Sequence, residues 1–126
     1  MSQIQESTLL VPFEVWEIQL GKRTIKFFEP LLLTPFWLED DPTEPDDPPA
    51  RNREYLGVER PDLEIFANGT NRRELWNSIC GDVRSAWTHF VRAEANRLSP
   101  HGKRIRKNYL RIAEEVGSIA EEVDNG

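Results

Sequence analysis

Residues 63–75 read LEIFANGTNRREL, and this stretch decides the fold because it contains both a strand and the start of a helix. Apolar residues alternate with other residues over 63–68, as in a strand with one buried face. Gly69 ends the alternation. Asn71 is a good helix N-cap, and Glu74, three residues later, is its capping-box partner. The stretch therefore predicts a half-buried strand that leads directly into a helix.

The helix that starts after Asn71 carries one broad apolar face. Its apolar residues recur at spacings of three and four: Leu75, Trp76, Ile79, Val83, Trp87, Phe90 and Val91. This spacing predicts an amphipathic helix that runs to about Arg97 and packs against a sheet. Gly81 lies inside the helix and costs about 1 kcal/mol relative to Ala, which favours close packing at that position.

Three more stretches favour strands, because they hold aromatic, β-branched or alternating apolar residues: 12–20, 24–28 and 55–58. The last of these could pair with 63–68 as a hairpin. Pro30 and Pro35 cannot donate to a strand ladder, so the chain between 28 and 38 is expected to be an edge strand or an irregular crossing. Together the stretches predict an α+β fold, in which a helix covers an antiparallel sheet of three or four strands.

An acidic, proline-rich segment interrupts the pattern at residues 39–50. It reads EDDPTEPDDPPA, with six acids and four prolines, and it cannot bury enough apolar surface to fold. We expect a disordered, solvated loop. The alternative is a tethered acidic arm that covers a basic surface.

Ser99 and Pro100 open a second helix, since Ser supplies a capping oxygen and Pro suits the first helical position. Apolar residues then recur at spacings of four and three: Ile105, Tyr109, Ile112, Val116, Ile119 and Val123. The pattern predicts a C-terminal helix over 99–123 with a narrow heptad seam. A narrow seam packs on another helix, either the first helix of this chain or a helix of a partner.

Charges along this last helix follow the order opposite to the one that the helix macrodipole favours. Five bases crowd its start: Lys103, Arg104, Arg106, Lys107 and Arg111. Acidic residues follow from residue 114 onward. Antiparallel pairing of two copies would set each basic start against the other copy's acidic end, so we predict a homodimer through the seam. The alternative is that both ends are solvated and pair within the helix, as Arg111 with Glu115.

The chain of 126 residues has a net charge of −6, which is unevenly spread. Residues 1–50 hold ten acids and three bases, whereas residues 51–126 hold twelve acids and thirteen bases. The acidic balance argues against a nucleic-acid coat protein, and one cysteine excludes a disulfide framework. No run of about 18 apolar residues favours a membrane span, and residues 1–6 are too polar for a signal peptide. We expect one soluble, cytoplasmic domain over 1–126.

Few residues carry reactive chemistry. Cys80 falls on the apolar face of the first helix and is interpreted as a buried structural thiol. His89 and His101 have no second His or Cys at a metal-ligand spacing, and the sequence has no phosphate-binding loop or nucleophile motif. We therefore predict no catalytic residue, no metal site and no cofactor. The seven bases from Arg92 to Arg111 could neutralise phosphates, so a nucleic-acid surface is an alternative.

The order of strand, Pro-Asp-Leu turn, strand, glycine, polar cap and Glu over residues 55–91 resembles the core of the HicB-type antitoxins and their stand-alone relatives. Gly69, Asn71, Glu74 and Leu75 occupy the positions of that pattern. The resemblance implies a three-stranded antiparallel sheet with one helix across it, a dimer, and a small basic ribonuclease toxin as partner. Many such antitoxins add a C-terminal DNA-binding unit, where this chain has the charged helix over 99–123.

These observations favour a non-enzymatic protein–protein interaction module, an antitoxin-like or regulatory small protein that binds another protein. The alternative is a nucleic-acid-associated regulator that uses the basic start of the last helix. A small enzyme ranks third among the hypotheses, because no constellation of catalytic residues supports it.

Overall fold

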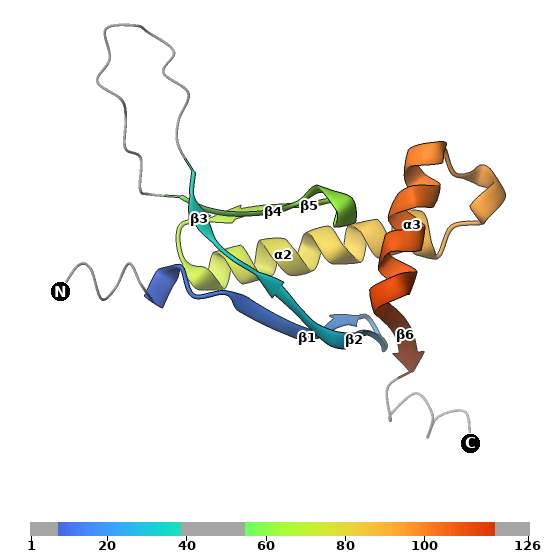
Figure 1. Cartoon of the computed structure of the whole chain (residues 1–126). Helices are drawn as coiled ribbons and strands as arrows, with labels where there is room; N and C mark the ends of the chain where they lie inside the picture. The colour runs from blue at the N-terminus through green and yellow to red at the C-terminus, as the bar shows by residue number, and fades with distance from the viewer. Residues whose placement is uncertain (1–7, 39–54, 118–126) are drawn as a thin grey trace, which may run out of the picture.

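The computed structural model describes residues 8–38 and 55–117 and shows an α+β fold, as predicted (Figure 1). Its strands are β1 (Phe13–Leu20), β2 (Arg23–Leu33), β3 (Phe36–Trp37), β4 (Leu56–Arg60), β5 (Ile65–Gly69) and β6 (Ala113–Gly117). Its helices are α2 (Arg72–Ala86), which continues as the π-helical turn η2 (Trp87–Val91), and α3 (Pro100–Ile112), with the 3-10 turns η1 (Pro61–Leu63) and η3 (Ala95–Arg97). The predicted acidic loop over 39–50 lies outside the described residues.

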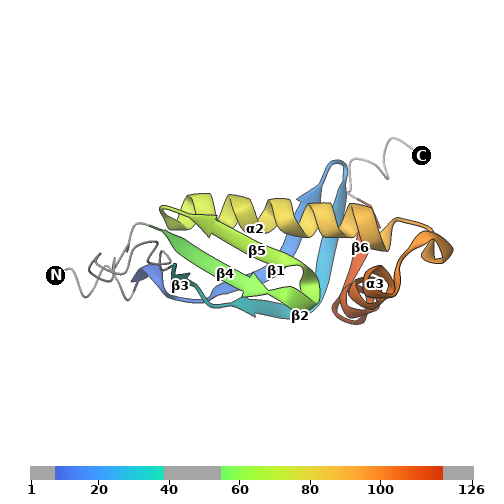
Figure 2. The ribbon, with the colours of Figure 1, turned by 90° about the horizontal axis from the view of Figure 1, so that it is seen from above.

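The strands form two antiparallel sheets of three strands each. The first sheet has the order β1-β2-β6, and the second has the order β3-β4-β5. The chain passes from one sheet to the other through residues 34–35, between β2 and β3. Helix α2 contacts β4 and β5 of the second sheet and β1 of the first, and Figure 2 shows it running alongside these strands.

One face of α2 supplies the centre of the core. Leu75, Ile79 and Val83 are completely buried, as the predicted apolar face requires. Buried residues of both sheets surround them: Val15, Ile18, Ile25, Phe27, Leu33, Leu56, Val58, Ile65 and Ala67. Because each fully buried side chain of this kind contributes roughly 1.5–3 kcal/mol, the two sheets and the helix are held together by one shared apolar core.

The transition from β5 to α2 has the predicted helix cap. The side chain of Asn71 accepts a hydrogen bond from the backbone N–H of Glu74, at 2.9 Å. The Glu74 carboxylate accepts from the backbone N–H of Thr70 at 2.8 Å rather than from that of Asn71, so the capping box is shifted by one residue. Gly69 is required here, because a Cβ at this position would lie 2.5 Å from the backbone nitrogen of Leu75.

Side chains of α2 also accept hydrogen bonds from the backbone N–H groups at the free edge of β5. Three backbone N–H groups donate to three α2 side chains: Phe66 to Asp82 (2.8 Å), Asn68 to Ser78 (3.1 Å) and Thr70 to Glu74 (2.8 Å). The donors are spaced two residues apart along the strand and the acceptors four residues apart along the helix. These two spacings match, because two strand residues rise about 6.8 Å and four helical residues about 6 Å. These side chains occupy the N–H groups that an added strand would use.

Strand β2 passes through Pro30 at an irregular point. The pairing of β2 with β1 shifts between Val15–Leu31 and Glu17–Lys26. Residues 28–30 consequently pair with neither β1 nor β6. Pro30 therefore lies where no ladder donor is needed. The strand continues through Leu33, and residues 31–33 pair with β1 and with no other described strand, so this part is the predicted edge strand rather than an irregular crossing.

The end of the first helix differs from the prediction of a helix to about Arg97. Regular α-helix stops at Ala86, and the π-helical turn η2 ends at Val91. Arg106 of α3 donates to the backbone carbonyls of residues 90, 91 and 93, which the helix end leaves without partners. The close packing predicted at Gly81 is also wrong, because nothing lies within 4 Å of a Cβ built there.

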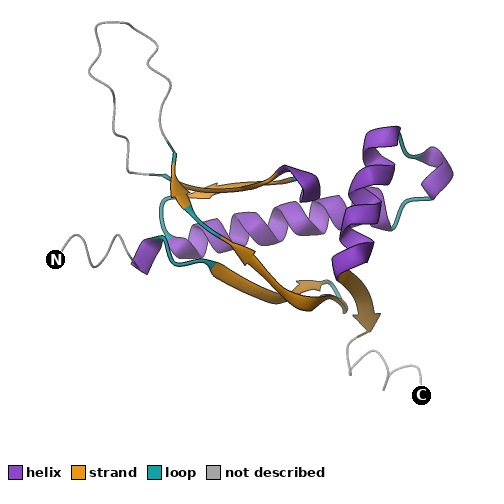
Figure 3. Ribbon diagram, in the orientation of Figure 1, coloured by secondary structure: helices purple, strands orange, loops and turns teal. Residues whose placement is uncertain are grey.

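The C-terminal helix predicted over 99–123 is wrong for residues 113–117. Ser99 caps α3 and Pro100 begins it as predicted, but the helix ends at Ile112. Ala113–Gly117 then forms β6, which pairs with residues 23–27 of β2 and is drawn as a strand in Figure 3. The apolar spacing fits both structures, and the long-range pairing decides in favour of the strand, with Ala113 buried beside Phe27.

Candidate interaction surfaces

The predicted heptad seam is divided between two elements and is mostly internal. Ile105 and Tyr109 of α3 are completely buried in the chain's own core. The Tyr109 hydroxyl donates to the carbonyl of Leu63 at 2.5 Å, and burial raises the pKa of this phenol. Ile112 ends α3, Val116 lies on β6, and both are half-buried. Ile119 and Val123 lie outside the described residues, so no continuous helical seam faces a partner over the described part.

Helix α3 is held in place by polar contacts with η1 and the residue after it. The side-chain amide of Asn108 donates to the carbonyl of Asp62 at 2.8 Å, one residue before the Tyr109 contact. His101 and Glu64 form an ion pair when the imidazole is protonated. These contacts lie on the inward side of α3 and leave its opposite side to solvent.

The predicted basic patch occupies that solvent-facing side. Lys103, Arg104, Lys107 and Arg111 are exposed, and none forms an ion pair with another residue in the ranges 8–38 and 55–117. Arg106 is the exception, because its guanidinium is used by the carbonyls at the end of η2. The structure therefore brings four of the five predicted bases together as free surface charges.

Two hollows in the surface meet beside this basic side. The first, about 520 Å³, is lined by Ala95, Lys103, Arg106, Lys107, Leu110 and Arg111. The second, about 390 Å³, is lined by Phe27, Phe28, Glu29, Pro30, Leu31, Arg111 and Ile112. Arg111 borders both, and four bases line the first hollow, whereas the second is lined by five apolar residues with Glu29 and Arg111.

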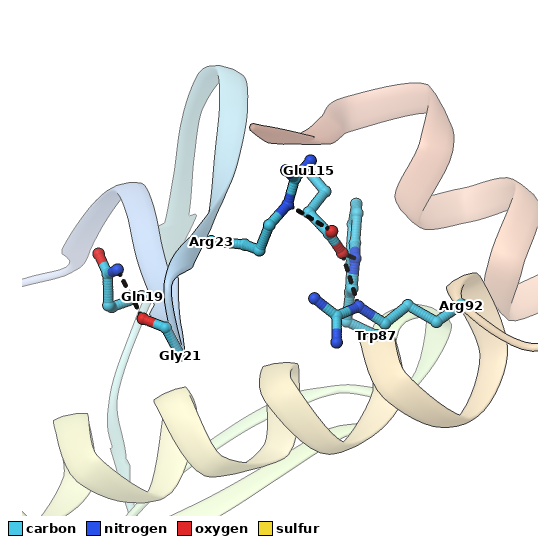
Figure 4. Close-up of polar contacts among 6 residues, drawn as sticks. All are labelled: Gln19, Gly21, Arg23, Trp87, Arg92 and Glu115. Atoms are coloured by element: carbon cyan, nitrogen blue, oxygen red, sulfur yellow. Dashed lines mark hydrogen bonds and ion pairs between the residues drawn. The ribbon is translucent and has the colours of Figure 1, made fainter. Parts of the chain in front are cut away.

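Glu115 of β6 is at the centre of a polar cluster that sequence reasoning missed (Figure 4). Its carboxylate accepts from Trp87 Nε1 at 2.8 Å, from Arg92 Nε at 2.8 Å and from Arg23 Nε at 2.9 Å. The hydrogen bond from Arg92 is the main reason that the pKa of Glu115 falls to about 2, with further lowering by Trp87 and Arg23 against the effect of burial. The cluster ties β6 to β2 and to the end of the first helix.

Large apolar side chains are exposed on the outer face of the first sheet, the face turned away from α2. Trp16 is 54% exposed, Phe28 56% and Leu32 58%. Leu32 pairs across the sheet with Glu14, and Trp16 follows Glu14 on the same face. Glu17, Lys26 and Glu114 form a charged row across the three strands beside them. The face thus combines an apolar centre with a mainly acidic border.

The reactive side chains are arranged as structural residues. Cys80 is buried, and burial raises the pKa of its thiol, which disfavours the nucleophilic thiolate. His89 is exposed, with Nδ1 2.7 Å from the carbonyl of Ser85 one turn earlier. No group of three or more His, Cys, Asp or Glu side chains within 8–38 and 55–117 is placed to hold a metal ion.

Comparisons with protein-family models, curated proteins and solved structures find no match to this chain. The HicB-like assignment consequently stays a prediction. None of the described helices is long and apolar enough to cross a membrane.

Proposed function

We propose that this protein is a non-enzymatic protein-interaction module that binds a partner protein through the outer face of its first sheet. The observation that carries the proposal is the exposure of Trp16, Phe28 and Leu32, each more than half accessible to solvent. Exposed apolar clusters with a polar border mark interaction sites, and Trp is among the residues that dominate binding energy.

The border of this face defines the chemistry of the partner. Glu14, Glu17 and Glu114 outnumber Lys26, so a partner with basic residues around an apolar contact complements it. A small basic protein is also what the resemblance to HicB-type antitoxins implies, and an antitoxin-like or regulatory role is part of this proposal. A homodimer is the alternative occupant, since a two-fold contact could set Lys26 of one copy against a glutamate of the other.

The test uses a double variant with a matched control. Trp16→Ser/Leu32→Ser removes the apolar centre, whereas Phe66→Ser removes a similarly exposed aromatic residue, 52% accessible, from β5 of the other sheet. Tagged wild type and both variants are used to isolate complexes from the native cells, and light scattering measures self-association. We expect one defined complex, lost in the double variant and kept in Phe66→Ser. A wild-type chain that stays monomeric and forms no such complex contradicts the proposal.

The nucleic-acid-associated regulator predicted as the alternative would use a different surface, the exposed basic side of α3. The four exposed bases there are the observation that favours it. Binding of DNA or RNA that weakens steeply with salt, and that is lost when Lys107 and Arg111 are reversed in charge, would support this second function.

A further inference from the structure

We propose that the basic side of α3 and the two hollows beside it form a second docking groove, which binds an acidic segment of a partner protein that also carries apolar residues. This proposal does not rest on the outer face of the first sheet, although Phe28 borders both surfaces. It is carried by the shape of the groove, its charge and the rigidity of α3.

Both hollows combine apolar and charged side chains, with the bases concentrated in the first. Pro30, Leu31 and Ile112 line the second hollow, next to the segment of β2 that pairs with no strand of either sheet. Leu110, 44% exposed, lies in the lining of the first hollow. Arg111 lines both hollows, so the two lie next to each other.

The charge of the groove selects an anionic occupant. Lys103, Lys107 and Arg111 recur every four residues on one side of α3, over a length of about 12 Å. Arg104 lies beside them, and Glu29 is the single acid among the described residues that line the two hollows. Like charges held in a row without described counter-ions raise the local concentration of acidic ligands.

An acidic peptide fits these features better than a nucleic acid does. The second hollow is lined mainly by apolar side chains, aromatic and aliphatic, which suit a Leu or Phe side chain rather than a phosphate. The net charge of −6 also repels a long polyanion at distance, whereas a short acidic segment experiences chiefly the local field of α3. Carboxylates beside the bases of α3 and an apolar side chain in the second hollow would use both features of the groove.

The groove is preorganised. Gly102 lies close to Leu98 and Phe90, where a Cβ would approach both side chains to 3.3 Å. Asn108 and Tyr109 fix the inward side of α3 to backbone carbonyls of η1. Binding consequently requires little ordering of the helix itself, which lowers the entropic cost of docking.

The experiment measures fluorescence anisotropy with a labelled peptide of glutamates around a central Leu-Phe pair. The same peptide with glutamines, a DNA oligonucleotide and an RNA oligonucleotide serve as comparison probes. We expect the acidic peptide to bind the full chain and the glutamine peptide not to bind. Lys107→Glu/Arg111→Glu should weaken binding at least about tenfold, and Leu110→Ser about threefold.

The control variant Lys22→Glu/Arg73→Glu changes the net charge equally at exposed positions outside the groove, and it should bind like wild type. Trp16→Ser/Leu32→Ser should also bind like wild type, which separates this proposal from the proposed function. Circular dichroism confirms that each variant is folded. Equal loss in the control variant, or binding of DNA or RNA in place of the acidic peptide, overturns the proposal.

Discussion

The two sheets differ in how they are completed. The second sheet is built from one contiguous part of the chain, and α2 closes its edge with Glu74, Ser78 and Asp82. The first sheet joins residues 13–33 to β6, nearly a hundred residues away from β1, and its outer face exposes Trp16 and Leu32. Under the proposed function, the closed sheet is the scaffold and the open one offers the surface for a partner, although the closed sheet also exposes Phe66.

The largest effect is expected at the junction of β5 and α2. Gly69→Ala should destabilise the fold by about 3 kcal/mol, because the added Cβ meets backbone atoms of residues 74 and 75 that cannot move aside. Gly81→Ala, the same substitution in open space, should stabilise by up to about 1 kcal/mol. Urea unfolding of both variants measures the difference. Equal effects at the two glycines would show that the junction is not as tight as described.

A smaller effect is expected where the first sheet receives its last strand. Glu115→Gln should cost about 1.5 kcal/mol, since the two guanidinium groups lose their charged acceptor. The neighbouring Glu114→Gln is the control, because Glu114 is exposed on the outer face. An unchanged urea midpoint for Glu115→Gln would show that this cluster does not stabilise the attachment of β6.

The cluster around Glu115 also predicts that the free energy of unfolding depends on pH. The pKa of Glu115 is lowered from 4.5 to about 2 in the folded chain, so the unfolded state binds this proton first as pH falls. The stabilisation is present above pH about 4.5 and is lost progressively as pH falls toward about 2. The difference in unfolding free energy between wild type and Glu115→Gln should shrink over that interval. A difference that stays constant would contradict the lowered pKa.

The closed edge of the second sheet gives a local prediction. Ser78→Ala removes the acceptor of the Asn68 N–H and should cost about 1 kcal/mol. Hydrogen exchange at the Asn68 amide should become faster, while Asn77→Ala, on the exposed face of α2, leaves it unchanged. Unchanged exchange at Asn68 in Ser78→Ala would mean that α2 does not protect this edge.

The sequence predicted those parts of the fold that depend on neighbouring residues. Asn71 and Ser99 cap their helices and Pro100 begins α3 as expected, because capping uses atoms within one helical turn. The strand over 113–117 could not be recognised, because the spacing of Ile112 and Val116 suits a helix and the pairing with β2 is a long-range event.

The candidate surfaces were predictable only in part. The bases of α3 are visible as a charge cluster in the sequence, but their exposure follows from the anchoring of Asn108 and Tyr109 to η1. The exposure of Trp16 was not predictable, because the shift in pairing after Val15 decides which face of the sheet it joins. Glu115 falls within the predicted C-terminal helix, so its contacts with Arg23, Trp87 and Arg92 could not be recognised from the sequence.

The smallest effect on stability should come from the outer face of the first sheet. Trp16→Ser is expected to change the unfolding free energy by less than about 0.5 kcal/mol, because the side chain is already more than half exposed. Urea unfolding measures this effect. A large loss of stability would show that Trp16 belongs to the core and is not a binding residue.

The central claim is that the open sheet, and not the closed one, binds a protein. Site-specific photo-cross-linking tests it most directly, with a benzophenone amino acid at Trp16 in one variant and at Phe66 in another, expressed in the native cells. We predict a covalent adduct of one defined mass from position 16 and none from position 66. No adduct at position 16, or the same adduct from both positions, would contradict the claim.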